Sequence, residues 1–198
     1  METVRDFSGQ NEDLQLIQQC LGGECQAFAG LVDRHKRTVF NLCYRLLGNQ
    51  EDAEDISQEA FVRLFQNLHK YKIDLKISNW IYTIALNLCR NHLRRKKIVR
   101  MISLTHWLQP REEDSIKELP DTGASLEDKL THRSTLALVQ KLALTLSEPL
   151  QIPFVLKYFQ QLSDEDIAEI QNISINHVRV NIHKAKMQIW KKVKNINS

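Results

Sequence analysis

The chain contains 198 residues with a net charge of +3, of which 42% are hydrophobic and 26% are charged. This composition is ordinary for folded proteins and is sufficient for one large domain or two small ones. The acidic, polar N-terminus differs from a secretion signal, and no apolar run is long enough to span a bilayer. The sequence therefore predicts a cytoplasmic protein without direct membrane insertion.

Charge is unevenly distributed along the chain. Residues 75–111 carry eight Lys or Arg and no acidic residue, whereas residues 112–128 have a net charge of −6 and residues 170–198 a net charge of +6. Because clustered cations attract a polyanionic backbone, two basic segments separated by an acidic one predict two nucleic-acid-binding surfaces.

The four cysteines are scattered through the first half of the chain, at Cys20, Cys25, Cys43 and Cys89. None forms a CxxC pair, and three occupy apolar positions of expected helices, where small buried thiols are common. We therefore predict free structural thiols rather than a metal or redox site, and no cofactor.

Few glycines and prolines, together with long stretches of helical periodicity, predict an all-α fold. The first two helices are expected over residues 11–21 and 24–47. Gly22 and Gly23 end the first of them, and Gly48 ends the second.

The third helix is expected to begin after the N-cap Asn49, with acidic residues in its first turns. Its apolar residues recur at spacings of three and four, which leaves a polar face of Asp52, Asp55, Gln58, Glu59 and Arg63 outside. Capping accounts for the acids at the start of this helix, but it accounts less well for Gln58 and Glu59.

Residues 71–79 break the helical pattern and predict a loop, which precedes a helix reaching Arg100. This helix is apolar on one side and cationic at its end, and Trp80 and Tyr82 stand near its start. Such a segment suits a nucleic-acid backbone, and the aromatic rings suit stacking on an unpaired base. The alternative is that both aromatic residues belong to the core and that the basic run is a solvated helix end.

A flexible linker is expected over residues 101–128 because prolines and acids replace the periodic pattern there. Helical periodicity resumes at about Leu126 and continues to Leu146. Ser147 is then expected to cap a helix that reaches about Gln160.

The C-terminal segment predicts a helix-turn-helix. Ser163 caps a short helix, residues 171–174 form a tight turn, and Ser174 caps a longer second helix. Amide and basic groups near the start of the second helix suit the base edges of the DNA major groove. A plain antiparallel helix pair is the alternative.

Three motifs occur in order: GNQEDAEDISQEAF at residues 48–61, WIYTIALN at residues 80–87 followed by Arg94 and Arg95, and the serine-capped pattern from Ser163 to Ala185. With them the chain resembles bacterial sigma factors of the extracytoplasmic-function (ECF) class over nearly its whole length. Departures from the family pattern, which affect only the expected local packing, occur at Asn91, Gln151 and Pro153.

The resemblance implies a region 2 domain over residues 1–100, the linker over 101–128 and a region 4 domain over 129–198. Members of this family bind core RNA polymerase, bring it to promoters and start strand opening. The polymerase partners implied are the β′ clamp helices and the β flap, and an anti-sigma factor is a further expected partner. By resemblance, the clamp helices contact the outward residues Asp52, Asp55, Gln58 and Glu59.

The resemblance also divides the DNA contacts between two promoter elements. Minus-ten contacts are expected at Lys76, Ser78, Asn79, Trp80, Tyr82, Arg90, Arg94 and Arg95. Minus-thirty-five contacts are expected at Ser174, Asn176, His177, Arg179, Val180, His183, Lys184 and Lys186. Among these, the Arg179 fork suits O6 and N7 of a guanine, whereas Lys184 and Lys186 suit phosphates.

Two other classes of protein are alternatives to a sigma factor. A helix-turn-helix regulator that does not act as a sigma factor would leave the acidic third helix and the first basic segment unexplained. An enzyme would need a catalytic array, a phosphate-binding glycine loop or a metal motif, and the sequence contains none of them.

Overall fold

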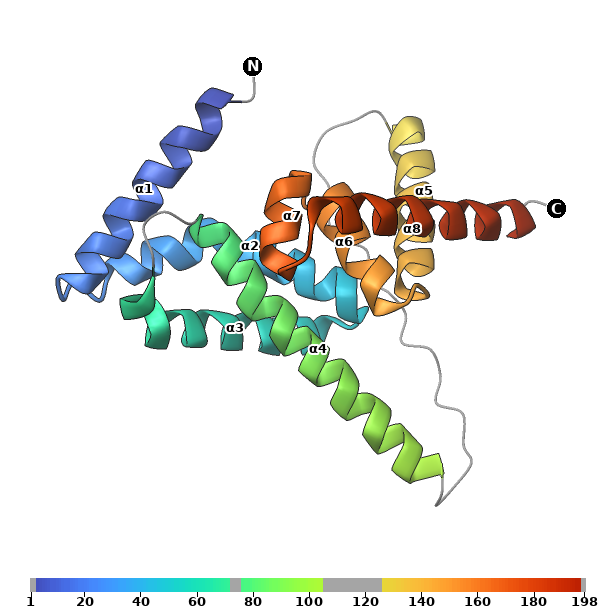
Figure 1. Ribbon diagram of the computed structural model, residues 1–198, viewed down its shortest axis with the longest axis horizontal. Helices are drawn as coiled ribbons and strands as arrows, with labels where there is room; N and C mark the ends of the chain where they lie inside the picture. Colours follow the sequence, from blue (N-terminus) through green and yellow to red (C-terminus); the bar gives the residue numbers. More distant parts are fainter. Residues whose placement is uncertain (1–2, 72–75, 105–125, 197–198) are drawn as a thin grey trace.

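The computed structural model describes residues 3–71, 76–104 and 126–196, with side chains described for 10–71, 76–98 and 135–195. Within these residues every regular element is a helix, which confirms the all-α prediction. The helices are α1 (Thr3–Leu21), α2 (Ala27–Leu47), α3 (Gln50–Asn67), the 3₁₀ turn η1 (Leu68–Lys70), α4 (Ile77–Leu104), α5 (Leu126–Leu144), α6 (Glu148–Tyr158), α7 (Asp164–Gln171) and α8 (Ile175–Ile196). We call α1–α4 the N-terminal module and α5–α8 the C-terminal module (Figure 1).

Local capping sets several helix ends as predicted. Gly48 ends α2 in the left-handed conformation with φ 71°, and the Asn49 side chain accepts from the backbone N–H of Asp52. The Ser163 hydroxyl accepts a hydrogen bond from the backbone N–H of Asp166 and donates one to the Asp166 carboxylate. Ser174 caps α8 by accepting from the backbone N–H of His177 at 3.2 Å. These bonds satisfy amide groups that a helix start leaves open.

Several predicted boundaries are wrong. The first helix begins at Thr3 rather than at residue 11. The second helix begins at Ala27 rather than at residue 24, and α4 continues to Leu104, beyond the predicted end at Arg100 and into the predicted linker. Helix α4 begins at Ile77, so Ser78 and Asn79 lie in its first turn and not in a loop. The cause is tertiary, because Ile77 is only 3% exposed and anchors this turn in the core. Residues 72–75 of the predicted loop and 105–125 of the predicted linker lie outside the described residues.

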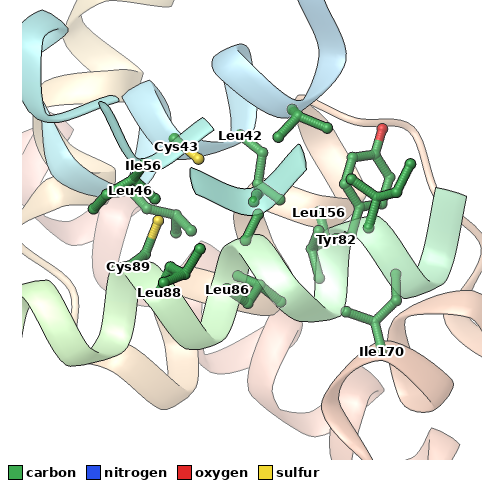
Figure 2. Packing of buried hydrophobic residues seen from close by; sticks show 14 of the residues in the cluster. Leu42, Cys43, Leu46, Ile56, Tyr82, Leu86, Leu88, Cys89, Leu156 and Ile170 are labelled. Atoms are coloured by element: carbon green, nitrogen blue, oxygen red, sulfur yellow. The ribbon is translucent and has the colours of Figure 1, made fainter. Parts of the chain in front are cut away.

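One hydrophobic core runs through both modules. Leu42 of α2, Leu86 of α4 and Leu156 of α6 are all essentially inaccessible to solvent and belong to a single cluster. Figure 2 shows these side chains around α4, with Ile170 of α7 on its other side. A smaller cluster joins α5, α6 and α8. Helix α4 is therefore packed from two sides, by α2 and α3 and by the C-terminal module.

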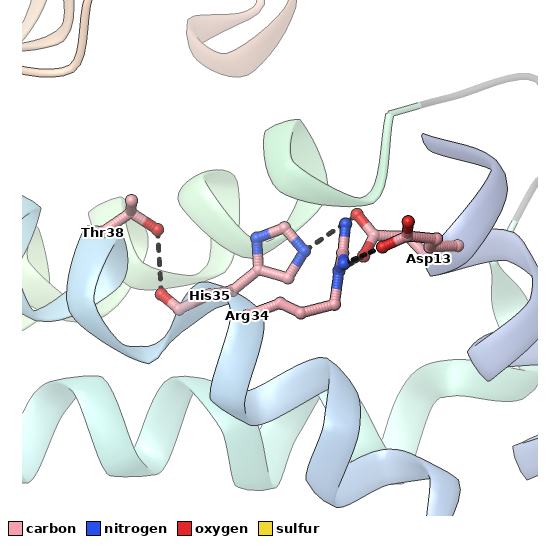
Figure 3. Close-up of polar contacts among 5 residues, drawn as sticks. Asp13, Arg34, His35 and Thr38 are labelled. Atoms are coloured by element: carbon pink, nitrogen blue, oxygen red, sulfur yellow. Dashed lines mark hydrogen bonds and ion pairs between the residues drawn. The ribbon is translucent and has the colours of Figure 1, made fainter. Parts of the chain in front are cut away.

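Hydrogen bonds and ion pairs between Asp13 of α1 and Arg34 and His35 of α2 connect the two helices (Figure 3). The Arg34 Nε donates to Asp13 Oδ1 at 2.7 Å, and His35 Nε2 lies 2.9 Å from Asp13 Oδ2. Burial alone would raise the pKa of Asp13, but the bonds from His35 and Arg34 outweigh it and hold that pKa below its ordinary value. The buried carboxylate is thus fully paired, as burial of a charge requires.

All four cysteines are free thiols, as predicted. Cys43 of α2 and Cys89 of α4 are both buried in the core around α4 (Figure 2). A hydrogen bond with Cys43, together with burial, raises the pKa of the Cys89 thiol well above its usual range. Cys89 therefore stays protonated and behaves as an apolar core residue.

Gly48 offers a test of how the modules pack. A β-carbon at Gly48 would lie 2.8 Å from Leu144 Cδ1 of α5, whereas Gly23, which also has positive φ, has open space around it. Gly23→Ala should reduce the free energy of unfolding by about 1–2 kcal/mol through backbone strain alone. The half-buried Leu144 side chain can rotate aside, so we expect Gly48→Ala to cost only about 0.5–1 kcal/mol more, measured by urea unfolding.

Leu144→Ala provides the control for this clash. In the Gly48→Ala background it should remove the extra loss, because the contacting methyl groups are gone. Equal losses for the two glycine variants would contradict the packing of α5 against the end of α2.

Candidate polymerase and nucleic-acid surfaces

The acidic face of α3 is largely open to solvent. Asp55, Gln58 and Glu59 are exposed, and Glu59 accepts from Arg63 Nε at 2.7 Å one turn further along. These residues border a depression of about 500 Å³ between α3 and α4, whose floor includes Leu88. Exposed acids beside apolar surface are suited to a basic protein partner.

Asp52 differs from the other three acidic-face residues. It is half-buried, lies 3.3 Å from His92 Nε2 and is paired with Lys96, both on α4. The prediction that Asp52 points outward with Asp55 is therefore wrong in this structure. Its carboxylate instead joins α3 to α4.

The start of α4 faces the C-terminal module. Asn79 is 2% exposed, and its Nδ2 donates to Asp166 Oδ1 and to Glu169 Oε2, each at 2.9 Å. Lys76 Nζ lies 3.2 Å from Asp166 Oδ1. Burial would raise the pKa of Asp166, but bonds from Asn79, Ser163 and Lys76 outweigh it and lower that pKa. Two of the predicted minus-ten residues are thus bound to carboxylates of α7.

Two further predicted minus-ten residues also face this module. Tyr82 is 6% exposed, its hydroxyl donates to Gln160 Oε1 at 3.4 Å, and burial raises its pKa. Arg90 Nε donates to Glu148 Oε1 of α6 at 2.8 Å. The core interpretation therefore holds for Tyr82, and the expectation that it is open to an unpaired base is wrong for this arrangement.

Trp80 lies on a different side of α4. It is half-buried and stacks on Tyr71, with ring centroids 5.7 Å apart and planes inclined by 27°. Both rings line a depression of about 460 Å³ with Asn67, Lys70 and Asn87. Sequence reasoning missed Asn67, Lys70 and Tyr71 as neighbours of Trp80, because no periodic pattern relates the segment around η1 to the first turn of α4. It also did not single out Asn87, although a spacing of seven residues places it on the same face of α4 as Trp80.

The far part of α4 carries the exposed cations Arg94, Arg95 and Lys97. In Figure 1 this part of the helix projects away from the other helices. The predicted basic end of the helix is therefore accessible, in contrast to its start.

The helix-turn-helix is formed by α7 and α8. Asn172 adopts the left-handed conformation with φ 52°, and the turn closes through the Ile173 N–H, which donates to the Ala168 carbonyl at 3.0 Å. Val178, Ile182 and Ala185 hold α8 in the core, as predicted. The predicted minus-thirty-five residues are all exposed: Ser174, Asn176, His177, Arg179, Val180, His183, Lys184 and Lys186.

Lys186 stands apart from the rest of this set. It borders an apolar groove between α5, α6 and α8, with its Nζ 5.9 Å from the Tyr158 ring centroid. The groove has a volume of about 730 Å³, and Met187 and Trp190 on its wall are more than half exposed. Sequence reasoning did not identify this groove, which three helices form together.

No group of three or more metal-ligating side chains occurs among the described residues. None of the helices within the described ranges is both long enough and apolar enough to cross a membrane.

Comparisons with known proteins match both modules. The Sigma-70 region 2 family matches residues 31–98, and the Sigma-70 region 4 family matches residues 136–189. The first match runs from Leu31 in α2 to Ile98 in α4, and the second contains α6 and α7 completely and α8 up to Ile189.

Curated relatives align over nearly the full chain. The ECF RNA polymerase sigma factor SigW of Bacillus subtilis is 35% identical over 188 residues, which cover 91% of this chain and 96% of the relative. The ECF RNA polymerase sigma-E factor of Escherichia coli K12 is 27% identical, with 94% and 97% covered.

Solved structures share the fold. CnrH, in complex with the cytosolic domain of CnrY, has a TM-score of 0.65 at 20% identity and covers 93% of this chain and 98% of its own. The sigma factor RpoE of Bartonella quintana, in complex with the anti-sigma factor NepR, has a TM-score of 0.67 at 17% identity, with 84% and 96% covered. The two region matches and the relative at 35% identity establish that this chain belongs to the ECF sigma factors of the sigma-70 family, which are non-enzymatic proteins that direct RNA polymerase.

Proposed function

We propose that this chain binds core RNA polymerase in the cytoplasm through α3, directs it to promoters through α4 and α8, and promotes DNA melting. The observation that supports the proposal is the combination of an exposed acidic α3 with two separate exposed basic surfaces on one sigma-family chain. A helix-turn-helix regulator acting without polymerase would need only the C-terminal module.

The proposed polymerase contact is the α3 face around Asp55, Gln58 and Glu59, docked on the β′ clamp helices. Because Asp52 is already paired with α4, its role in this contact is to keep α3 in place. Charged rims steer association and set specificity, and the neighbouring depression between α3 and α4 supplies the apolar area.

The apolar groove of the C-terminal module is the proposed site for the β flap and for a helix of an anti-sigma factor. Trp190 and Met187 offer a large exposed apolar wall, and Lys186 and Lys194 lie over aromatic rings at its border. An amphipathic helix with acidic flanks would bury the groove and pair with these lysines. Of the structural neighbours with this fold, RpoE is a sigma factor in complex with the anti-sigma factor NepR, and CnrH is in complex with the cytosolic domain of CnrY.

The proposed site for a flipped minus-ten base is the depression beside Trp80 and Tyr71. A base that leaves the stack loses a few kcal/mol, which aromatic stacking of about 1–3 kcal/mol per base offsets. The amide groups of Asn67 and Asn87, which line the same depression, supply hydrogen bonds to base edges. Arg94 and Arg95 would hold the phosphates further along α4.

The predicted minus-ten donors Lys76 and Asn79 become available only when the modules separate. Asn79 and Lys76 bind Asp166 and Glu169 in this arrangement, so carboxylates occupy the groups that we propose for DNA. Promoter opening therefore requires α7 to leave α4. Polymerase binding, which uses the open α3 face, does not require this step.

Asp55→Arg tests polymerase docking. Reversing this exposed charge should weaken core polymerase binding by about tenfold or more, because like charges then meet across the interface. Run-off transcription with core polymerase measures the effect, and the unaltered chain should make core enzyme promoter-specific.

Glu24→Arg, at an exposed acid in the connection between α1 and α2, is the matched control and should transcribe normally. Normal run-off transcription by Asp55→Arg would remove α3 from the interface. No promoter-specific product with the unaltered chain would refute the sigma function.

Trp80→Ala tests base capture. Loss of the ring should reduce the equilibrium constant for open-complex formation by about five- to a hundredfold, which corresponds to the stacking free energy of one base on an aromatic ring. Trp80→Phe, which keeps an aromatic face, should retain most of the opening. Permanganate reactivity of promoter thymines reports the open state, and unchanged reactivity with Trp80→Ala would contradict this site.

Asn79→Asp tests the contact between the modules. A carboxylate here would face Asp166 and Glu169, and an uncompensated buried charge costs about 3–5 kcal/mol. We expect the modules to separate, which small-angle scattering would detect as a larger radius of gyration. Ser78→Asp adds the same charge one residue earlier and should leave the radius unchanged. The same radius of gyration for Asn79→Asp and Ser78→Asp would argue against the contact of Asn79 with Asp166 and Glu169.

A further inference from the structure

Three side chains from three helices of the C-terminal module meet beside the exposed face of α8. Arg179 Nε of α8 donates to Asp164 Oδ2 of α7 at 3.0 Å, and Lys157 Nζ of α6 donates to Asp164 Oδ1 at 2.8 Å. The Asp164 side chain is 20% exposed, whereas that of Arg179 is 64% exposed. Hydrogen bonds from Lys157 and then from Arg179 lower the pKa of Asp164, so the carboxylate is ionised at neutral pH.

The contact with Asp164 leaves the two terminal nitrogens of the Arg179 guanidinium available to bind DNA. Asp164 accepts the hydrogen bond from the Nε–H group, and among the described residues the terminal Nη1 and Nη2 have no hydrogen-bond partner. Those two nitrogens form the fork that donates to O6 and N7 of guanine. Lys157 holds the second oxygen of Asp164, which fixes the carboxylate and hence the direction in which the fork points.

We propose that Asp164 is a positioning residue for promoter recognition, holding Arg179 so that its two terminal nitrogens are presented to a guanine of the minus-thirty-five element. This inference rests on the proposed role of α8 in DNA reading. It identifies a specificity residue on α7, the helix that does not itself carry the predicted base contacts.

Two physical effects should make Asp164 increase discrimination between sequences. Ordering a long side chain on binding lowers the affinity by about two- to tenfold. Because the hydrogen bond on Nε already orders Arg179 before DNA binds, part of this loss is avoided for the cognate base. The carboxylate also repels phosphates and partly neutralises Arg179, which weakens sequence-independent binding. Removing the charge should thus lower cognate affinity and leave non-cognate affinity equal or higher.

Asp164→Asn provides the test, with Glu165→Gln as its matched control. Both changes remove one negative charge from the first turn of α7, but Glu165 is exposed and lies outside the Lys157–Asp164–Arg179 contact. Holoenzyme assembled from core polymerase and each variant is bound to promoters in which single minus-thirty-five positions are varied. Arg179→Ala and the double variant Asp164→Asn/Arg179→Ala are measured beside them.

Asp164→Asn should reduce discrimination by about two- to tenfold, at the same one or two positions where Arg179→Ala reduces it. The double variant should discriminate no worse than Arg179→Ala alone, because the carboxylate acts through that arginine. Glu165→Gln should keep the full preference. A structural role in capping α7 would instead weaken binding to all sequences, in both Asp164→Asn and Glu165→Gln.

Three results would overturn the inference. The first is that Asp164→Asn keeps the full discrimination while Arg179→Ala loses discrimination. In that case α8 would still read bases through Arg179, but Asp164 would play no part in it. Another is a further loss in the double variant. The third is an unchanged preference with Arg179→Ala, which would refute base reading through that residue, whereas run-off transcription reports separately on the sigma function.

Discussion

The burial of α4 from two sides is the constraint on which the rest of the structure depends. Ile81 and Leu86 of α4 are essentially inaccessible and share one cluster with Leu156 of α6 and Ile167 of α7. Each such side chain contributes about 1.5–3 kcal/mol when fully buried. Because this shared core draws the start of α4 against α7, the polar groups on that surface must find partners inside the protein.

That requirement explains which proposed functional surfaces are open and which are closed. Asn79 and Tyr82 find partners in the C-terminal module, so they are closed to other ligands in this arrangement. The acidic face of α3, the depression beside Trp80 and the basic end of α4 lie outside the shared core and stay accessible. An order of events follows from the proposed function: polymerase can dock first, and minus-ten contacts form once the modules part.

The acidic first turn of α7 connects the two proposed DNA surfaces. Its acids stabilise the helix start through the dipole and through the Ser163 cap. In addition, Asp166 binds Lys76 and Asn79 of the N-terminal module, and Asp164 binds Arg179 on α8. Acidification through the carboxyl range would weaken the Asp166 contact, since a group with a lowered pKa stabilises the fold above its unfolded pKa and loses that effect as pH falls through the folded value.

The sequence alone determined the features that arise from neighbouring residues. The Asn49, Ser163 and Ser174 caps, the end of α2 at Gly48 and the helix-turn-helix depend on bonds spanning three to five residues, so composition and spacing reveal them. Tertiary structure decided the rest. The start of α4 at Ile77, the pairing of Asp52 with α4 and the burial of Asn79 under Asp166 join segments that are far apart in the chain. Periodicity reports which face of a helix is apolar, but it does not report which distant helix covers that face, and this is why the closed minus-ten surface appears only in the folded protein.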